Sequence, residues 1–509
     1  MRKTVKPRSS IRPWTSESRF SPSDFGGSFV YDLLVLGDDL ASHVAAAYAS
    51  RNGLKTLLVA PDGLGGVQLI GDFVFHLDPA PMTGLGPGQP GFSVLAELGV
   101  EIPESHPTSM NPAYQVLLPC HRIDFFNDPD SLFAELAREF PEREADIRDF
   151  YGTAREASLV FQDWIAEHPR IQPQTLKEYF SYLKIFPFVL QYKFAAARFD
   201  RLLSQDAALE KVWEAQQALL SLNTDDLFSF PSAFQYSAPL RGIAGFPQGK
   251  QFLFNEMIRL LESCGGLYLS RHTVTSIARG KTITLEMKTP DGLASQATGR
   301  YLILSTKSDA LPLLNAKRGH SPFWQRFRPA AIAGYPFTLF LGVREKFLPE
   351  PMARHIAVVA DVQKDLYDRN LILLETGMPE KDKPLSQAKN CITATVYLPA
   401  EDSVWTPGAL SEDAESILVR LEEFFPFLKE GIELYDLDKS IELSLSGRKV
   451  LSPKYKVRNA LFTSFSAASD RTKWNNIFLT GASLLADFGF EAEILSGKNA
   501  ALRILQKGK

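Results

Sequence analysis

The sequence lacks the residue patterns that mark several large classes of protein. Its three cysteines, Cys120, Cys264 and Cys391, lie far apart and do not have the spacing of a metal or redox site. The eight histidines include no H-x-x-x-H pair, so we expect no dedicated transition-metal site. Neither a G-x-S-x-G elbow nor a G-x-x-x-x-G-K-[ST] loop occurs, which argues against an α/β-hydrolase and a P-loop NTPase.

Long apolar runs and a strong charge imbalance are also missing. No uninterrupted run of about 18 apolar residues is present, so we expect no transmembrane segment. A net charge of −4 gives no reason to expect a nucleic-acid partner. The basic residues 1–29 contain no apolar core of a secretory signal and predict a flexible tail, with a docking arm as the alternative. We therefore expect a cytoplasmic protein, with contact to a membrane surface left open.

What the sequence does contain is a dinucleotide-binding framework near its start. Residues 31–59 read as an apolar strand, a turn at Gly37, an Ala-rich helix and a second strand, which is a βαβ unit. Such a unit normally carries G-x-G-x-x-G, with glycines for the turn, the approach to a pyrophosphate and the helix packing. The three positions here are Gly37, Asp39 and Ser42, with Leu40 and Ala41 between. A carboxylate at Asp39 about 4 Å from a pyrophosphate charge would cost about 4 kcal/mol of electrostatic repulsion per charge pair at an effective dielectric constant of about 20.

The second strand also lacks a residue that normally binds the nucleotide. An acidic residue at its end would accept a hydrogen bond from the adenosine ribose, but Ala60 stands there. Losing such a bond to a charged group forfeits about 1.5–3 kcal/mol. Asp62 follows two residues later, after Pro61 has turned the chain.

Two further pieces of the framework follow at a distance. Residues 245–277 predict a Gly-rich entry, a helix that Gly265 and Gly266 end, and two strands. This piece continues with a ribbon over 282–287 and a short strand at 301–304. The last piece consists of a strand at 477–479, a turn at Gly481 and a helix over 491–505.

In this order and at these separations, the pieces resemble the phytoene desaturase, carotenoid isomerase and amine oxidase branch of the FAD-dependent oxidoreductases. The paired Gly65 and Gly66 match glycines after the second strand of that family, and Val274 stands where the family places backbone near the adenine. Residues 477–497 resemble the family's closing flavin motif. The resemblance implies an α/β fold with a discontinuous Rossmann-like FAD/NAD(P)-binding domain, whose parallel sheet carries helices and a β-ribbon, and an α+β substrate domain with a mixed sheet.

The resemblance also implies a division of the chain. We predict the FAD-binding type of domain over 30–105, 236–310 and 451–509. The substrate or cap domain takes 106–235 and 311–450. Within it, 130–151 reads as one amphipathic helix, and the aromatic stretch 179–199 is interpreted as a buried helical pair, with a substrate tunnel or a membrane contact as the alternative.

Departures from the closing motif fall at positions that face the cofactor in the family. Ala482 replaces an aspartate that anchors the flavin. The family's turn Gly-Val-Glu-Gly-Ala is here Gly489-Phe490-Glu491-Ala492-Glu493, which adds bulk and charge. With Asp39 and Ala60, these changes predict weak or absent FAD binding.

Two functional classes remain, and no catalytic residue is assigned in either. The first is a flavin-dependent oxidoreductase of the phytoene desaturase type, in which FAD does the redox chemistry on an apolar or polyene-like substrate. The second is a non-catalytic relative that has lost FAD and serves as a scaffold, a partner subunit or a binder of apolar ligands.

Overall fold

The computed structural model describes most of the chain from Val30 to Lys507. The described residues are 30–63, 65–102, 110–167, 176–203, 205–224, 227, 230–246, 248–308, 310–315, 330–377, 384, 387–447, 453–457, 470–485 and 488–507. The N-terminal tail predicted for 1–29 lies outside them. None of the described helices combines the length and the apolar character that crossing a bilayer requires.

The first sheet brings the three predicted framework pieces together. Its central strands β1, β2, β7, β10 and β17 run parallel, and β9 and β8 extend one side as an antiparallel ribbon, in the order β7-β2-β1-β10-β9-β8 with β17 also on β10. The strands are β1 Val30–Leu36, β2 Thr56–Ala60, β7 Leu267–Ser270, β8 Thr273–Arg279, β9 Ile283–Lys288, β10 Ala294–Ser305 and β17 Ile477–Thr480. β10 is far longer than the predicted strand at 301–304 because its first half pairs with the ribbon.

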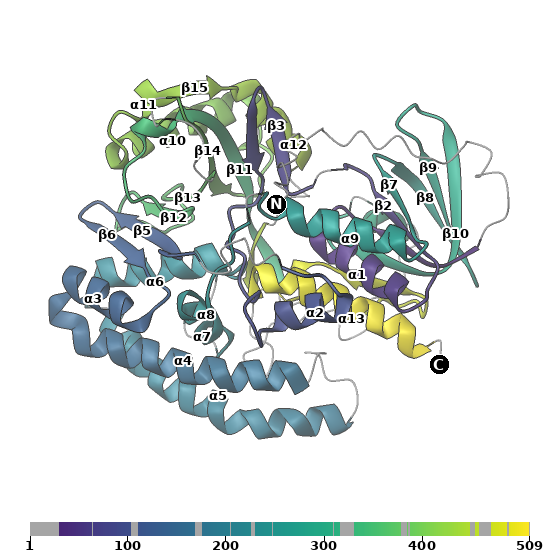
Figure 1. Cartoon of the computed structure of the whole chain (residues 1–509), viewed down its shortest axis with the longest axis horizontal. Coiled ribbons are helices and arrows are strands. Elements are labelled where there is room, and N and C mark those ends of the chain that lie inside the picture. Colours follow the sequence, from purple (N-terminus) through teal and green to yellow (C-terminus); the bar gives the residue numbers. More distant parts are fainter. Residues whose placement is uncertain are drawn as a thin grey trace, which may run out of the picture.

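Helices cover this sheet, and the face towards them is apolar. Helix α1 (Leu40–Arg51) packs between α13 (Phe490–Lys507) and α9 (Gln251–Ser263), as Figure 1 shows. Alanines on α1 are fully buried, and their small side chains allow this close packing. At the closest approach, a Cβ on Gly497 of α13 would lie 2.4 Å from the Ala41 carbonyl oxygen. The Rossmann-like fold expected from the sequence is confirmed.

The second sheet is mixed, and its central strands are buried. Its order is β15-β11-β14-β13-β12-β5-β6, with β16 also on β11, and only the β12–β5 pair is parallel in that path. The strands are β5 Tyr114–Leu118, β6 His121–Phe125, β11 Ala330–Arg344, β12 His355–Val359, β13 Leu371–Thr376, β14 Lys389–Leu398, β15 Ile432–Tyr435 and β16 Lys454–Val457. A separate hairpin joins β3 (Val67–Ile70) to β4 (Phe73–His76). The α+β substrate part with its mixed sheet is thus also present.

Helices pack on both ends of the second sheet. One group lies at the lower left of Figure 1 and one at the upper left. These helices are α3 Pro129–Glu139, α4 Glu144–Glu167, α5 Leu176–Leu203, α6 Ala207–Leu220, α7 Phe230–Tyr236, α8 Ala238–Arg241, α10 Pro407–Phe424, α11 Leu428–Gly431 and α12 Leu437–Gly447. Helix α2 (Pro90–Leu98) instead lies beside α13. The division into domains stays a prediction.

Two predictions about the helical region were wrong. The single helix over 130–151 is two helices, because Pro141 ends α3 and starts a short 3₁₀ turn before α4. The aromatic stretch is one helix, α5, and it is only half buried. Tyr192 and Phe199 lie in the core, whereas Phe180 and Phe194 are 65% and 72% exposed.

Candidate functional site

The turn after β1 places a carboxylate at the start of α1. Asp39 is the N-cap of this helix and accepts hydrogen bonds from the Ser42 amide at 3.0 Å and the Ser42 hydroxyl at 2.5 Å. The Ser305 hydroxyl, at the end of β10, donates a third at 2.6 Å. The free amides of a helix N-terminus are the groups that bind a pyrophosphate in this type of fold. In this protein, the carboxylate of Asp39 takes that place.

Glycines on either side of Asp39 are packed by protein atoms. A Cβ on Gly37 would lie 2.4 Å from the Ser42 Oγ and 2.5 Å from the Ser305 Cβ. Gly481 has a φ of +133°, and a Cβ there would lie 2.4 Å from the Thr306 Oγ1 and 3.4 Å from Asp39 Oδ2. Both glycines are therefore required by the close approach of the protein's own side chains.

A second carboxylate lies beside Asp39. Asp38 accepts hydrogen bonds from the amides of Asp62 at 3.0 Å and Gly63 at 2.8 Å. Burial, together with the nearby charge of Asp62, raises the pKa of Asp38 to about 8. Ala60 is buried at the end of β2, where it pairs with Ser270. The end of β2 thus presents a methyl group, and Asp62 on the turn after β2 lies beside Asp38 on the turn after β1.

The paired glycines after β2 are also covered. The side chain of Gln251, at the start of α9, accepts a hydrogen bond from the Gly66 amide at 2.8 Å. A Cβ on Gly65 would lie 2.2 Å from the same oxygen. These glycines allow the approach of α9.

The start of α13 is closed by ion pairs. Glu491 is fully buried and accepts from Arg241 Nη2 at 3.1 Å, while the Arg241 guanidinium stacks 3.5 Å above the ring of Phe234. A Cβ on Gly84 would lie 2.2 Å from the carboxyl carbon of Glu491. Burial raises the pKa of Glu491, and Arg241 opposes this shift.

A further ion pair lies two residues along the helix. Glu493 accepts from Lys307 Nζ at 3.3 Å, and both side chains are almost fully buried. Lys250, whose Nζ lies 2.9 Å from Asp78 Oδ2, sits 5.4 Å from the ring centre of Phe490. Cations and carboxylates from four separate segments of the chain therefore form ion pairs at this end of the site.

The remaining predicted site residues lie in the surrounding core. Leu40, Ala41 and Ala482 are buried, and Gly489 is held by the approach of α6, since a Cβ there would lie 1.9 Å from the Leu220 oxygen. Val274 is partly buried on β8 and packs against the core on one face of the first sheet. The structure therefore gathers residues 37–42, 481–482 and 489–491 around one site, with Gly65 and Gly66 beside α9.

Sequence reasoning missed the partners of these residues. Their contacts with Ser305, Gln251, Arg241 and Lys307 were not predicted. The position of Ser305 and Lys307 directly after a buried strand was the one available signal, because strand ends line the ligand crevice in open α/β sheets.

The residues present do not fit FAD. A pyrophosphate at the start of α1 would have to displace the Asp39 carboxylate from the amide and hydroxyls that it binds. An isoalloxazine at the start of α13 would meet the Arg241–Glu491 pair, whose side chains contact Phe234 and Gly84. Among the described residues, no group of histidine, cysteine and carboxylate side chains has the arrangement of a metal site.

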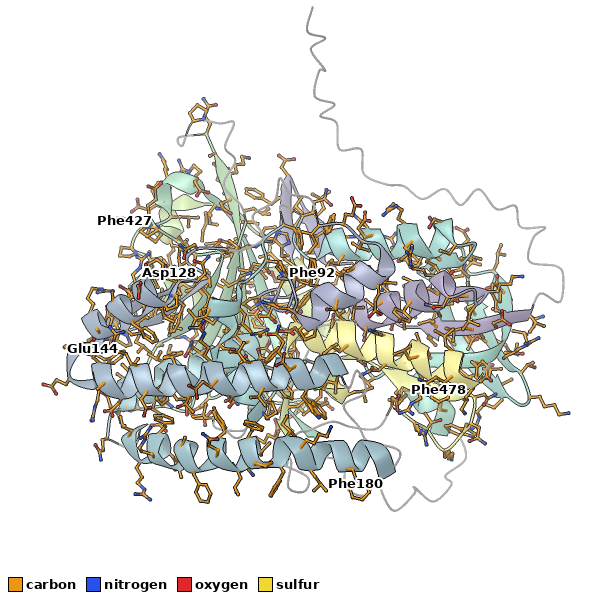
Figure 2. The ribbon with its side chains drawn as sticks, turned by 60° about the horizontal axis from the view of Figure 1, so that its bottom comes forward. Phe92, Asp128, Glu144, Phe180, Phe427 and Phe478 are labelled. Carbon is orange, nitrogen blue, oxygen red and sulfur yellow. The ribbon has the colours of Figure 1, made fainter. Side chains whose placement is uncertain are left out.

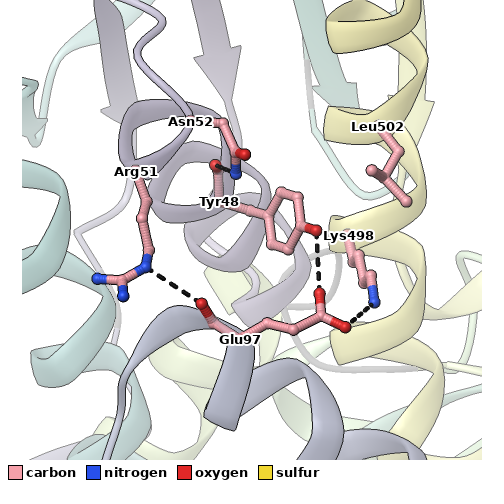
Figure 3. A pocket seen from close by; sticks show the side chains of 6 residues that line it. All are labelled: Tyr48, Arg51, Asn52, Glu97, Lys498 and Leu502. Carbon is pink, nitrogen blue, oxygen red and sulfur yellow. Dashed lines mark hydrogen bonds and ion pairs between the residues drawn. The ribbon is translucent and has the colours of Figure 1, made fainter.

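A separate groove of about 600 Å³ lies on the surface between α1, α2 and α13 (Figure 3). Its polar side chains bind one another. Glu97 accepts from the Tyr48 hydroxyl at 3.0 Å and from Lys498 Nζ at 2.7 Å, and Arg51 donates to the Glu97 carbonyl at 3.1 Å. This mutual pairing links the three helices. The candidate site is therefore the region between the start of α1, at Asp39, and the start of α13, at Glu491 and Glu493, which we call the closed crevice.

Comparison with solved structures finds the same fold in an oxidase, in an oxidoreductase and in a RAB GDI. A putrescine oxidase double mutant matches with a TM-score of 0.58 at 13% identity, covering 94% of this chain and 99% of its own. An oxidoreductase from Methanosarcina mazei matches at 0.55 and 13%, covering 92% and 99%. A RAB GDI from Plasmodium falciparum matches at 0.50 and 11%, covering 94% and 98%. No protein-family model and no curated protein matches in sequence. At such identities, the likeness defines the fold alone.

Proposed function

We propose that this protein is a non-catalytic user of the flavoprotein fold, which serves as a scaffold, partner subunit or binder of apolar ligands and does not hold FAD. The observation that carries this proposal is the capping of α1 by Asp39. Its carboxylate is buried and makes three hydrogen bonds at the place where the fold binds a pyrophosphate.

The opposite end of the crevice supports the same proposal. Two buried ion pairs hold the start of α13 to its neighbours: Arg241–Glu491 connects it to α8, and Lys307–Glu493 connects it to the end of β10. A cofactor bound here would have to separate α13 from these elements. Removing one member of a buried ion pair costs about 3–5 kcal/mol, so opening this end is energetically demanding. The fold itself permits such a role, since one of the similar structures bears the name of a RAB GDI and not of an oxidase.

The second candidate is a flavin-dependent oxidoreductase that acts on an apolar or polyene-like substrate. It is favoured by the names of the other similar structures, which include a putrescine oxidase and an oxidoreductase. In that case FAD would supply the redox chemistry, and the protein would have to rearrange at both ends of the crevice to admit it.

An absorbance spectrum of freshly purified protein, with mass spectrometry of the small molecules released on denaturation, separates the two candidates. We expect a colourless protein whose melting temperature does not rise in excess FAD, because a ligand that does not bind cannot stabilise the folded state. Flavin bands with FAD in the released fraction would overturn the proposal in favour of the oxidoreductase.

Two variants then distinguish the electrostatic block from the steric one. Asp39→Asn removes the charge and keeps a good N-cap, whereas Asp39→Gly removes the side chain. We expect neither variant alone to bind FAD, because the ion pairs at the start of α13 remain. Binding by Asp39→Asn would show that the charge of Asp39 is the main block.

A further inference from the structure

Helix α5 presents an unusual amount of apolar surface to solvent. Figure 2 shows it at the edge of the molecule, with Phe180 pointing away from α4. Its exposed large apolar side chains, with their exposed fractions, are Phe180 65%, Leu183 62%, Phe186 37%, Phe188 46%, Leu190 42% and Phe194 72%. Contiguous apolar patches of this kind on a soluble protein mark interaction sites.

The exposed residues follow the spacing of a coiled-coil seam. Phe180, Leu183, Pro187, Leu190 and Phe194 alternate in steps of three and four residues, and all are exposed. A different stripe attaches the helix to the rest of the protein. It consists of Ile185, Val189, Tyr192 and Phe199, which are 1–3% exposed. The outer stripe is thus not part of the core pattern, and it has the form of a seam for another helix.

The size of the patch matches what a dimer requires. With about 180 Å² for each large side chain, the four large residues of the seam, Phe180, Leu183, Leu190 and Phe194, expose on the order of 400 Å². A standard interface buries about 800 Å² on each partner, of which about 65% is apolar in homodimers. A second, equal patch would therefore complete an interface of ordinary size and composition.

The arrangement along α5 is close to symmetric about Pro187. Phe186 and Phe188 flank it directly, and Phe180 and Phe194 lie seven residues away on either side. A two-fold interface requires a self-complementary surface, and an antiparallel pair of such helices provides one.

We propose that α5 is the interface of a homodimer, in which two copies of this chain pair their α5 helices antiparallel across a two-fold axis near Pro187. The alternative occupant, a lipid surface, requires a broad apolar face on the helix. On α5, Lys184 and Gln191 lie directly beside the seam and are exposed, which narrows the apolar face to the width that suits a second helix.

The experiment measures the molar mass of the full-length chain by sedimentation equilibrium over a range of micromolar concentrations. We expect the wild type to have twice the chain mass of 56.7 kDa. Leu183→Glu should weaken dimerisation by roughly 100-fold or more, because each dimer would bury two uncompensated carboxylates at its centre. Leu69→Glu is the matched control, since Leu69 is equally exposed at 61% but lies on β3.

The other outcomes are also decisive. A wild type that stays monomeric throughout the range overturns the proposal, and binding of that monomer to vesicles of anionic phospholipid would assign the patch to a lipid surface. Equal dissociation of Leu183→Glu and Leu69→Glu would place the interface elsewhere. Because Leu183→Glu changes an exposed side chain, its circular dichroism melt should match the wild type. If the melt of Leu183→Glu differs from that of the wild type, Phe194→Lys provides a second test of the interface.

Discussion

The two ends of the closed crevice are satisfied by different chemistry. At the start of α1, Asp39 is held by an amide and two hydroxyls, which are neutral donors. At the start of α13, Glu491 and Glu493 each face a buried cation, from Arg241 and Lys307. One end thus keeps a carboxylate through hydrogen bonds and the helix dipole, and the other through charge compensation.

This difference shows how the fold adapts to side chains in place of a cofactor. A helix N-terminus already carries partial positive charge, so Asp39 needs no direct ion pair, although the charge of Lys307 also acts on it. Glu491 is also in the first turn of a helix, but it is fully buried. Burial this deep requires a cation, which α8 supplies. The two ends should therefore respond differently to mutation.

The largest effect is expected when the cation is removed from the α13 end. Arg241→Met keeps an unbranched side chain over Phe234 but leaves Glu491 buried and uncompensated. We expect a loss of about 3–5 kcal/mol in the free energy of unfolding, measured by urea denaturation at neutral pH. The loss should shrink as the pH falls, because Glu491, whose pKa burial already raises, then takes up a proton.

Two comparisons control this prediction. The double variant Arg241→Met with Glu491→Gln should recover part of the loss, because a neutral pair has no buried charge to compensate. Arg148→Met breaks an ion pair with Glu144 in which both side chains are about half exposed, and it should change stability by less than about 0.5 kcal/mol. A loss of less than about 0.5 kcal/mol for Arg241→Met would show that solvent screens the Arg241–Glu491 pair.

The features of the fold and the site differ in how far the sequence alone could predict them. The three framework pieces were recognised because apolar runs and glycine turns are local signals, and the structure joins them in one parallel sheet. The departures at Asp39, Ala60 and Ala482 were recognised against the same pattern. The partners of Asp39 and Glu491 were not, because Ser305 and Arg241 lie 266 and 250 residues away and no local period links them.

Exposure on α5 was mispredicted for a related reason. Aromatic residues are usually buried, and the composition of 179–199 does not distinguish one helix side from the other. The step of three and four residues from Phe180 to Phe194 was present in the sequence, but only the structure shows that a second stripe, through Ile185 and Val189, faces the core.

A pH-dependent effect is expected from Asp38 at the α1 end. The pKa of Asp38 is raised from 3.8 to about 8, so between these pH values the folded protein binds a proton that the unfolded chain has released. The free energy of unfolding should therefore fall as the pH rises through this window, since the contribution of Asp38 is complete below about pH 4 and lost above about pH 8. Asp38→Asn should flatten the decline between pH 5 and 8, as followed by urea denaturation.

The control for this slope is Asp72→Asn, which changes an exposed aspartate in the turn between β3 and β4. It should leave the pH dependence of stability as in the wild type. An unchanged slope in Asp38→Asn would mean that Asp38 is ionised in the folded protein across the whole range.

The smallest effect should come from a single neutral donor of Asp39. Ser305→Ala removes the hydroxyl that donates to Asp39 Oδ2 at 2.6 Å and leaves both bonds from Ser42 in place. A hydrogen bond to a charged group contributes about 1.5–3 kcal/mol, so the loss in unfolding free energy should lie in this range and below that of Arg241→Met. Ser411→Ala, which removes an exposed hydroxyl bonded to the Pro407 carbonyl, should change stability by less than about 0.5 kcal/mol. If Ser305→Ala destabilised the protein as much as Arg241→Met, Asp39 would depend on Ser305 as Glu491 depends on its cation, and the two ends of the crevice would be closed by equally strong interactions.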